Sequence, residues 1–331
     1  MTKIAIVGAG SFGVAIAKLF SSYPGCSVVL WSAVEKEIEA INKKNGVVDC
    51  LPGVVLNLEI VNVTTNVEAL KYADILVLAV ASKYLRNVAK IVLNYIKKDV
   101  ILVSAAKGLE DGSFKRMSEV VFDETRYENI VALSGPSHAE EIANLIPSTA
   151  VVSSLRVELA EKVQAIFNSS VFRIYVNEDI IGVEIGGALK NIIALAVGIC
   201  DGLGLGDNTK AALITRGLFE IEKFGMAMGA KRRTFAGLSG LGDLIATCIS
   251  RHSRNKKAGF LIGTGVSVID ALKKVNMTVE GYFATKTVYR FCKFKSLDLP
   301  IIENVYKILY EGSNIKNSIN ILMNRLPKHE F

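Results

Sequence analysis

The segment Ile4-Ala-Ile-Val-Gly8-Ala-Gly10-Ser-Phe-Gly13-Val-Ala-Ile-Ala17 joins an apolar run, typical of a buried strand, to a helical pattern through Gly-x-Gly-x-x-Gly. Gly8 permits a tight turn, Gly10 lets the backbone approach a pyrophosphate, and Gly13 lets the helix pack closely on the strand. The N-terminus of the helix then faces the anion. The glycine pattern alone is weak, but its place between a strand and a helix predicts a dinucleotide-binding site rather than a structural turn.

The length and composition indicate a compact protein of two domains. The chain has 331 residues, of which 50% are hydrophobic and 21% charged, so each domain can bury its own core. The net charge of +7 comes from 39 basic and 32 acidic residues, with no long block of lysine and arginine. We therefore expect no nucleic-acid partner. We interpret the excess positive charge partly as a field that attracts an anionic small substrate and mostly as background.

The cysteines and the first residues favour a cytoplasmic protein. Five cysteines are widely scattered and form no C-x-x-C pair, so we expect a reducing compartment and no metal site. The start of the chain passes directly into a core strand and leaves no room for a cleavable signal. Residues 180–200 are apolar enough for a membrane span, but Glu184, Lys190 and Asn191 are costly in hydrocarbon. The segment is predicted to be a buried core helix, without membrane insertion.

Two kinds of pattern divide the chain. Short β-branched runs alternate with helical patterns up to residue 176, which predicts an α/β Rossmann domain, a doubly wound parallel sheet with helices on both faces. The expected strands include 28–31, 75–80, 100–104 and 130–133. After residue 177 the pattern is helical, with helices expected at 179–201, 210–228, 266–274 and 278–294. We expect a dinucleotide-binding domain at residues 1–177, an all-helical substrate-binding and catalytic domain at residues 178–331, and a cleft between them.

The residues after the second strand bear on the choice of cofactor. A Rossmann site usually presents there an acid for the ribose hydroxyls or an arginine for a 2′-phosphate. This chain has Ser32-Ala33-Val34-Glu35, which contains no arginine, and its nearest acid is Glu35. That favours NAD over NADP. The alternative, that Glu35 is only an exposed residue in the first turn of a helix, stays open.

A lysine in the long apolar helix is the second informative feature. Lys190 follows Gly186 and Gly187 by one turn, and these glycines leave an open patch of backbone where a substrate can sit. Burial lowers the pKa of a lysine into the range where it exchanges protons. The residue is either a general acid and base or a snorkelling lysine beside a glycine contact between helices.

Further candidates follow two strands of the predicted sheet. Lys107 comes after the strand at 100–104, where open α/β sheets bind ligands, although a surface lysine at a turn is the alternative. Ser134-Gly-Pro-Ser137 follows the strand at 130–133 and is either part of a site or only a helix cap. His138 in the same turn is expected at the surface.

The helical part supplies a carboxylate and a basic cluster. Asp243 and Thr247 are four residues apart, so they share a helix face, and Asp243 is a candidate partner for Lys190. Arg254 and Asn255 lie within the basic stretch 251–257. The guanidinium suits a phosphate or carboxylate and the amide adds a neutral donor, unless the stretch is merely a solvated run of charge.

Seven motifs occur in one order along nearly the whole chain: Gly8-Ala-Gly10-Ser11-Phe12-Gly13, Lys107-Gly-Leu-Glu110, Ser134-Gly135-Pro-Ser137, Gly186-Gly-Ala-Leu-Lys190-Asn191, Leu241-Gly-Asp243, Ser253-Arg254-Asn255 and Val279-Glu280-Gly281-Tyr282. The combination is far more specific than any single motif. It resembles the NAD(P)-dependent sn-glycerol-3-phosphate dehydrogenases of the bacterial soluble type. The resemblance implies reversible reduction of dihydroxyacetone phosphate to sn-glycerol 3-phosphate for phospholipid synthesis, NAD(H) or NADP(H) as cofactor, and a homodimer.

The resemblance also assigns roles to individual residues. Lys190 is implied as the proton donor and acceptor, and the other residues at the reacting centre are Lys107, Asn191, Asp243 and Thr247. The substrate phosphate is implied to contact Arg254 and Asn255, and the rest of the substrate site comprises Lys107, Gly135, Ser137, Lys190, Asp243 and Ser253. The implied cofactor-binding residues are Gly8, Gly10, Ser11, Phe12, Gly13, Ala33, Lys107, Ala139, Arg254 and Glu280.

One position departs from the family, and two other functions compete. Many members carry arginine or histidine near position 33, where this chain has Ala33, which argues against strong use of NADP. A related β-hydroxyacid or ketopantoate-type dehydrogenase keeps the same architecture with a carboxylate substrate. A regulatory protein that senses NAD without turnover is the third possibility, against which stands the cost of placing Lys190 in an apolar helix.

Overall fold

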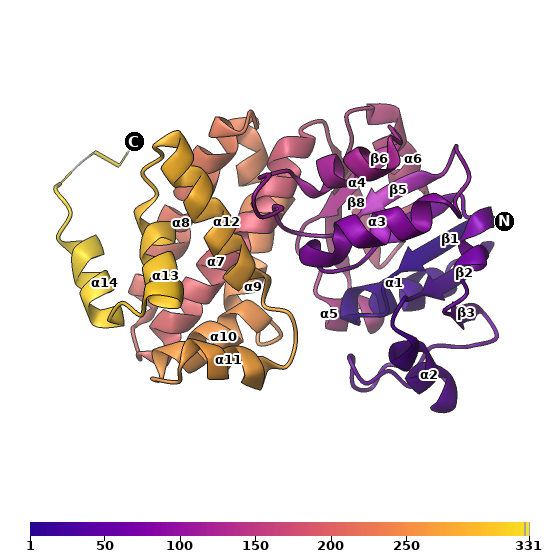
Figure 1. Cartoon of the computed structure of the whole chain (residues 1–331), viewed down its shortest axis with the longest axis horizontal. Coiled ribbons are helices and arrows are strands. Elements are labelled where there is room, and N and C mark those ends of the chain that lie inside the picture. The colour runs from indigo at the N-terminus through magenta and orange to yellow at the C-terminus, as the bar shows by residue number, and fades with distance from the viewer. Residues whose placement is uncertain (328, 331) are drawn as a thin grey trace.

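The computed structural model describes residues 1–327 and 329–330, and in that part of the chain the strands all precede residue 178 (Figure 1). The strands are β1 (Thr2–Val7), β2 (Cys26–Trp31), β3 (Val61–Thr64), β4 (Ile75–Leu78), β5 (Ile101–Ser104), β6 (Ile130–Ser134), β7 (Ser148–Ser153) and β8 (Phe172–Asn177). The helices among them are α1 (Ser11–Ser21), α2 (Glu35–Lys43), η1 (Val67–Tyr72), η2 (Ser82–Tyr84), α3 (Leu85–Leu93), α4 (Met117–Thr125), α5 (Ala139–Ala143) and α6 (Val157–Phe167). We call this part the sheet half and propose its boundary at residue 177.

The strands form one sheet in the order β3-β2-β1-β4-β5-β6-β7-β8. The predicted parallel pairing is present from β3 to β6 and again between β7 and β8. It is wrong only between β6 and β7, which run antiparallel. The connection from β6 to β7, residues 135–147, has the five-residue α5 as its helix. A crossover between parallel strands usually needs a dozen or more residues with a full helix, so this connection is near the minimum length. The chain does not travel back to the other end of the sheet before β7 begins.

Helices cover both faces of the sheet, as the sequence predicted. On one face, Phe20 of α1 and Phe167 of α6 pack against the strands in a single apolar core. On the other face, Leu85 of α3 and Val120 of α4 belong to a second core with the same sheet. Both faces of the strands are thus apolar, which explains the continuous β-branched runs in the sequence.

The rest of the described chain is helical, and we call it the helical half. Its helices are α7 (Ile180–Gly202), α8 (Asp207–Ala227), η3 (Arg232–Ala236), the π-helical turn η4 (Leu238–Gly242), α9 (Asp243–Ile249), α10 (Arg254–Gly263), α11 (Val268–Val275), α12 (Glu280–Lys295), α13 (Pro300–Glu311) and α14 (Ile315–Met323). The four predicted helices correspond to α7, α8, α11 and α12. A helix at α9 was expected from the shared face of Asp243 and Thr247, whereas α10, α13 and α14 were not predicted from the sequence.

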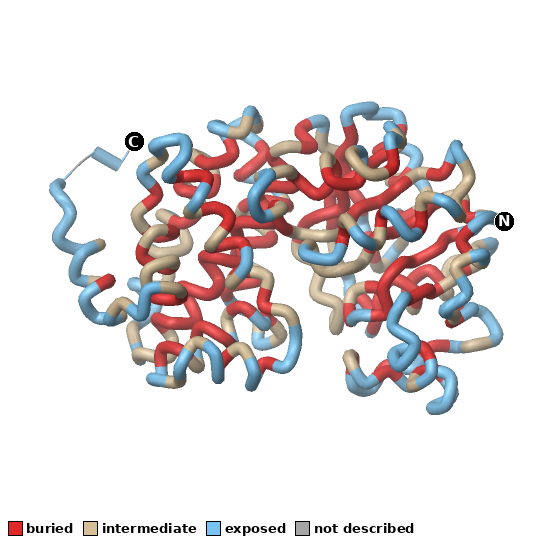
Figure 2. Tube along the Cα trace, viewed as in Figure 1, coloured by how far each residue is buried: buried red, intermediate tan, exposed pale blue. Residues whose placement is uncertain are grey.

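Helix α7 is the central element of the helical half, and Figure 2 shows it within the buried interior. It is the one helix of the described residues that is long and apolar enough to cross a membrane, yet 94% of its apolar window is buried in the protein. Its position agrees with the prediction of a core helix. Gly198 faces α10 so closely that a Cβ atom there would lie 2.1 Å from the Lys256 carbonyl oxygen. Glycine is therefore required where the two helices cross.

A buried polar contact joins the two halves. Arg116, which precedes α4, pairs with Glu184 of α7, and both residues are buried. The Ser118 backbone N–H also donates to Glu184, at 2.8 Å, and the Ser118 hydroxyl donates at 2.7 Å. Burial raises the pKa of Glu184, and these partners oppose that rise. The helix that carries Lys190 is therefore anchored to the sheet half.

Candidate functional site

The glycine loop between β1 and α1 has the geometry of an anion-binding turn. Gly8 has a φ of +112°, and Gly13 is so close to Gly8 that a Cβ would lie 1.9 Å from the Gly8 carbonyl oxygen. At Gly10, by contrast, a Cβ would meet nothing within 4 Å. Gly10 is also the N-cap of α1 and is exposed. Space is therefore open directly in front of the helix N-terminus, where a pyrophosphate binds in such loops.

The other predicted cofactor residues lie on or near this loop or at strand ends. Ser11 is buried and its hydroxyl donates to the Cys50 carbonyl at 2.9 Å, while Phe12 packs partly against the core. Ala33 is exposed directly after β2, and Ala139 begins α5 after β6. These positions all lie at the carboxyl edge of the parallel strands, where ligands bind in open α/β sheets.

Two lysines from different halves meet at one buried carboxylate. Lys190 Nζ of α7 lies 2.5 Å from Asp243 Oδ1, and Lys107 Nζ, which follows β5, lies 2.6 Å from Asp243 Oδ2. Lys190 also donates to Thr247 Oγ1 at 2.6 Å, and Thr247 donates to the Asp243 carbonyl at 2.7 Å. The predicted partnership of Asp243 with Lys190 is present. Lys107 donates further to the Gly135 carbonyl at 3.1 Å, which ties the cluster to the end of β6.

The pKa values of Lys190 and Asp243 are both lowered, which suits proton exchange by Lys190. Burial lowers the pKa of Lys190 to about 8; the Lys107 ammonium also lowers it, and the Asp243 carboxylate opposes the change. Burial would raise the pKa of Asp243, but the two lysines outweigh it and lower the pKa. Asp243 therefore stays ionised while Lys190 titrates near physiological pH.

The glycines before Lys190 are packed, which corrects one expectation. A Cβ at Gly186 would lie 2.4 Å from the Ser239 carbonyl oxygen, and one at Gly187 would lie 2.5 Å from Ser134 Oγ and 3.5 Å from Lys107. The predicted open patch of backbone is absent at Gly186, because the π-helical turn η4 packs directly on it. Gly187 instead gives the Lys107 side chain room to reach Asp243.

Asn191 and Asn255 form a fixed amide pair behind the lysines. Asn255 donates to Asn191 Oδ1 at 2.9 Å and accepts from the Gly281 backbone N–H at 2.8 Å. A Cβ at Gly281 would lie 2.5 Å from the Asn191 carbonyl oxygen, so glycine is needed for this approach. The pair connects α7, α10 and α12. One N–H of the Asn255 amide therefore serves Asn191, and the other makes no hydrogen bond within the described part of the chain, so Asn255 still has a donor for a phosphate.

Ser253 and the next residue, Arg254, differ sharply in exposure. Ser253 is buried and caps α10 by accepting from the Lys256 N–H at 3.2 Å. Arg254, the first residue of α10, is exposed and makes no hydrogen bond or ion pair within the described part of the chain. Its guanidinium is therefore available to an anion.

Two buried hydroxyls at the sheet edge lack a partner. Ser104 ends β5, Ser134 ends β6, and neither Oγ atom has a hydrogen bond to any residue that the structure describes. Ser137, in contrast, donates to the Gly135 carbonyl at 2.9 Å. Buried hydroxyls without partners are uncommon, and their position beside Lys107 fits a site where a bound molecule completes the hydrogen bonding.

Glu280 makes a contact that the sequence analysis missed. Its carboxylate, at the start of α12, accepts from the Ser82 hydroxyl at 2.8 Å and from the Ser82 N–H at 3.2 Å. Ser82 lies four residues beyond β4, so its place at the carboxyl edge of the sheet was the available signal. Burial raises the pKa of Glu280, and the Ser82 contacts oppose the rise. The pair joins the predicted cofactor residue Glu280 to the sheet half.

His138 is nearer to the cluster than predicted. The residue is half-buried rather than on the surface, its Nε2 lies 3.3 Å from the Ala246 carbonyl oxygen, and its ring centroid is 6.4 Å from that of His252. Burial lowers the pKa of His138, and the Lys190 and Lys107 charges add to the effect. The short α5 packs this turn against α9, which sequence spacing alone does not reveal.

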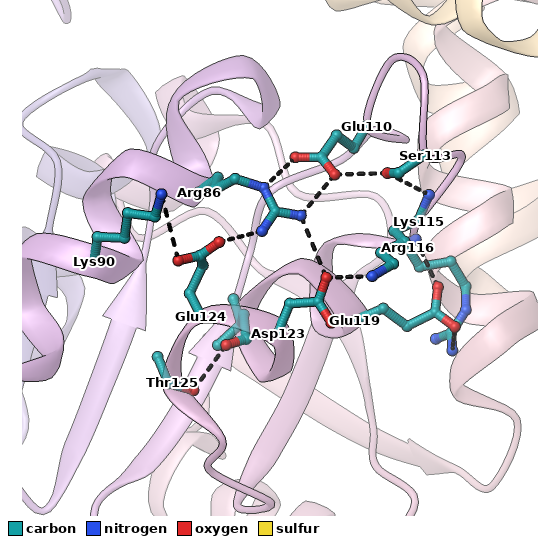
Figure 3. Close-up of polar contacts among 11 residues, drawn as sticks. Arg86, Lys90, Glu110, Ser113, Lys115, Arg116, Glu119, Asp123, Glu124 and Thr125 are labelled. Carbon is teal, nitrogen blue, oxygen red and sulfur yellow. Dashed lines mark hydrogen bonds and ion pairs between the residues drawn. The ribbon is translucent and has the colours of Figure 1, made fainter.

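A network of ion pairs holds the loop that presents Lys107 (Figure 3). Arg86 of α3 contacts Glu110, three residues after Lys107, through Nε at 2.6 Å and Nη2 at 2.7 Å. Arg86 also pairs with Asp123 and Glu124 of α4. A bidentate guanidinium fixes both position and orientation of a carboxylate. The Lys107-Gly-Leu-Glu110 motif is therefore fastened at its far end to two helices of the sheet half.

Comparison with known proteins agrees with this arrangement. Family models described as NAD-dependent glycerol-3-phosphate dehydrogenase N-terminus and C-terminus match residues 3–160 and 179–320. The chain is similar to the glycerol-3-phosphate dehydrogenase [NAD(P)+] of Pelotomaculum thermopropionicum, with 48% identity over 99% of this chain and 95% of the relative. It is also similar to the crystal structure of glycerol-3-phosphate dehydrogenase from Coxiella burnetii, with a TM-score of 0.92, 32% identity and coverage of 98% and 99% of the two chains.

A more distant likeness concerns the fold alone. A ketopantoate reductase structure from Ralstonia eutropha has a TM-score of 0.62 and 16% identity, over 93% of this chain and 97% of that one. The similarity shows that this architecture also occurs with other reductases, but it carries no argument for their substrate.

Proposed function

The chain belongs to the NAD-dependent glycerol-3-phosphate dehydrogenase family, and on that premise we propose that Lys190 exchanges the proton in the reversible reduction of dihydroxyacetone phosphate to sn-glycerol 3-phosphate. The protein is an oxidoreductase that uses NAD(H) or NADP(H). The observation that carries the proposal is the buried cluster in which Lys190 and Lys107 share the Asp243 carboxylate.

The glycine loop and strand edge fit a dinucleotide. The open space at Gly10 faces the N-terminus of α1, and the unpartnered hydroxyls of Ser104 and Ser134 lie at the same edge of the sheet. Gly8, Gly10, Ser11, Phe12, Gly13 and Ala33 would hold the adenosine and pyrophosphate side, and Lys107, Ala139, Arg254 and Glu280 the remainder. When bound there, NADH or NADPH would supply the hydride for the ketone carbon.

Lys190 and Lys107 stabilise the negative charge that develops on the ketone oxygen of the substrate, and Lys190 protonates that oxygen. As the ketone carbon gains the hydride, its oxygen gains negative charge, and two ammonium groups held on one carboxylate form a preorganised positive field. Lys190 then gives its proton to that oxygen, so the alcohol forms and the lysine is left neutral. In the reverse direction the neutral amine takes the proton back. Thr247, which accepts from Lys190 at 2.6 Å, fixes the direction of the ammonium.

Arg254 orients the substrate through its phosphate. The guanidinium is exposed and unpaired within the described residues. The Asn255 amide uses one N–H for Asn191, and its second N–H has no partner in the described part of the chain. We therefore assign the phosphate to Arg254 and Asn255, with Ser253 and the Gly135–Ser137 turn nearby. The contact between Asn191 and Asn255 also holds α7 and α10 together behind Lys190. Binding energy at the phosphate serves to position the ketone.

The direct test is the loss of reduced-cofactor absorbance when the purified protein meets dihydroxyacetone phosphate. We expect turnover, and no turnover with a ketone that carries a carboxylate in place of the phosphate. Preference for the carboxylate substrate would contradict the proposal. Folded protein that binds NADH but turns over neither substrate would indicate a sensor.

The family resemblance also bears on the oligomeric state and the cellular compartment. We propose a homodimer in the cytoplasm that supplies glycerophospholipid synthesis, as the family resemblance implies. All five cysteines are free in the structure, which suits a reducing compartment. Light scattering should then give about twice the chain mass of 35.8 kDa, and a mass near one chain would contradict the dimer.

A further inference from the structure

The turn after β2 holds a carboxylate that the sequence analysis did not single out. Ser32, which is buried, donates from Oγ to Glu37 Oε2 at 2.8 Å and accepts from the Val34 N–H at 3.1 Å. Glu37 lies in the first turn of α2 and is otherwise exposed. The hydroxyl therefore fixes the direction of a side chain that would be free on the helix surface.

This carboxylate lies near the glycine loop. The end of β2 touches the loop directly, because the Gly8 N–H donates to the Trp31 carbonyl at 2.8 Å. Cys50 also contacts the loop, with Sγ 3.6 Å from the Ala9 carbonyl oxygen. Burial raises the pKa of Cys50, and the Glu37 charge contributes to that rise. Glu37 is thus within electrostatic reach of the position where a dinucleotide presents its adenosine ribose.

No cation in the described structure neutralises Glu37. The basic residues of α2 and the turn after it are Lys36, Lys43 and Lys44, and two of them are occupied elsewhere. Lys43 pairs with Glu39 at 2.9 Å and Lys44 with Asp49 at 2.7 Å. Ala33 offers no donor. A 2′-phosphate would therefore meet a fixed carboxylate and no guanidinium.

We infer that Glu37, oriented by Ser32, makes this site select NAD(H) over NADP(H). The carboxylate accepts hydrogen bonds from the ribose hydroxyls of NAD(H) and repels the phosphate that NADP(H) carries at the same place. The inference rests on the proposed function, since it requires a dinucleotide at the glycine loop. Glu35, the nearest acid in the sequence, lies in the same helical turn without a hydrogen bond to any described residue and is the rival assignment.

Direct binding tests the inference without catalysis. The dissociation constants of NADH and NADPH are measured by nucleotide fluorescence, with no substrate present, for the wild type and for E37Q, S32A and E35Q. We expect NADH to bind at least about tenfold more tightly than NADPH, because a like-charge contact costs more than the 1.4 kcal/mol that a tenfold ratio represents. E37Q should reduce the ratio by about tenfold, S32A by less, and E35Q should leave it unchanged.

A gain of affinity completes the test. A33R combined with E37Q supplies the missing guanidinium and removes the repulsion, so NADPH should bind more tightly than NADH. The inference is wrong if wild-type protein binds both nucleotides equally, or if E35Q rather than E37Q changes the ratio. Because substrate turnover is assayed separately, such results would leave the proposed reaction standing, whereas NADH binding without turnover would contradict the reaction and not the selectivity.

Discussion

Lys190 and Lys107 approach opposite oxygens of one carboxylate, that of Asp243, at 2.5 and 2.6 Å. The two lysines come from different halves of the chain and are 83 residues apart in sequence (190 − 107). One buried negative charge therefore holds two positive charges, and the unit keeps a net positive charge for a developing alkoxide. This arrangement leads to specific predictions for the activity of Lys190.

Replacing Lys190 by alanine should abolish turnover while leaving NADH binding nearly intact. General acid–base catalysis contributes about 10²–10⁴ in rate, so kcat should fall by at least that range. Asp243 keeps Lys107 as its partner, so the fold should survive. Steady-state kinetics and an NADH titration measure the two effects. Near-normal activity would defeat the role of Lys190.

The direction of the reaction should set the direction of the pH profile. The pKa of Lys190 is lowered to about 8, so the amine is mostly protonated below that pH and mostly neutral above it. Initial rates of ketone reduction, which need the protonated form, should fall as pH rises through about 8. Rates of alcohol oxidation, which need the neutral form, should rise over the same interval. Profiles without a change near pH 8 in either direction would assign the proton to another group.

Arg254→Ala should mainly raise KM for the phosphorylated substrate. An arginine paired with a phosphate makes strong charged hydrogen bonds, and their loss should raise KM by at least about tenfold with a smaller change in kcat. Lys257→Ala, which removes the same charge from an exposed site one turn further along α10, is the matched control. An unchanged KM in the Arg254 variant would place the phosphate elsewhere.

Two glycines of the nucleotide loop should respond differently to alanine. At Gly13 the new Cβ would lie 1.9 Å from a backbone oxygen, so Gly13→Ala should destabilise the protein by about 1–3 kcal/mol. At Gly10 nothing lies within 4 Å and φ is −73°, so Gly10→Ala should keep its melting temperature but bind NADH more weakly. Calorimetry and nucleotide titration separate the two effects. Equal melting temperatures for both variants would contradict the packing argument.

Glu220 should make stability depend on pH. It accepts from the Ile301 and Ile302 N–H groups at 2.7 and 3.0 Å at the start of α13, and burial raises its pKa to about 7. The folded state therefore holds this proton more tightly than the unfolded state does. Stability is greatest below the ordinary pKa of a glutamate and should fall by about 3 kcal/mol as pH rises through 7.

The matched variant for this effect is Glu220→Gln, which retains one acceptor oxygen and cannot ionise. Its melting temperature should be nearly constant between pH 5 and 8, whereas that of the wild type should decline. The slope is the measurement, because the glutamine loses one hydrogen bond at every pH. An identical slope in both proteins would assign the pH dependence to other groups.

Local sequence patterns predicted the structural features that are determined by residues close together in the chain. The strand, glycine turn and helix around Gly8 to Gly13 follow from residue order alone, and a lysine in an apolar helix already indicated that Lys190 needs a charged partner. The continuous apolar strands likewise predicted a sheet covered on both faces. These features need no knowledge of distant segments.

Contacts between distant segments were much harder to predict. The packing of η4 on Gly186, the Ser82–Glu280 contact and the half-burial of His138 each join segments more than 50 residues apart. The reversal at β7 depends on how short α5 is, which the sequence did not make evident. Glu37 was missed for a different reason: its importance comes from the rotamer of Ser32, and no pattern of residue types encodes a rotamer.

The Arg116–Glu184 contact has a consequence for how the chain folds. If the helical half folded alone, Glu184 would lose Arg116 and both hydrogen bonds from Ser118. The apolar cluster that Ile180 and Val183 of α7 form with Ala132 and Val151 of the sheet would also be opened to water. The two halves are therefore expected to melt together as one cooperative unit, and severing the chain near residue 178 should leave fragments that need each other to stay folded.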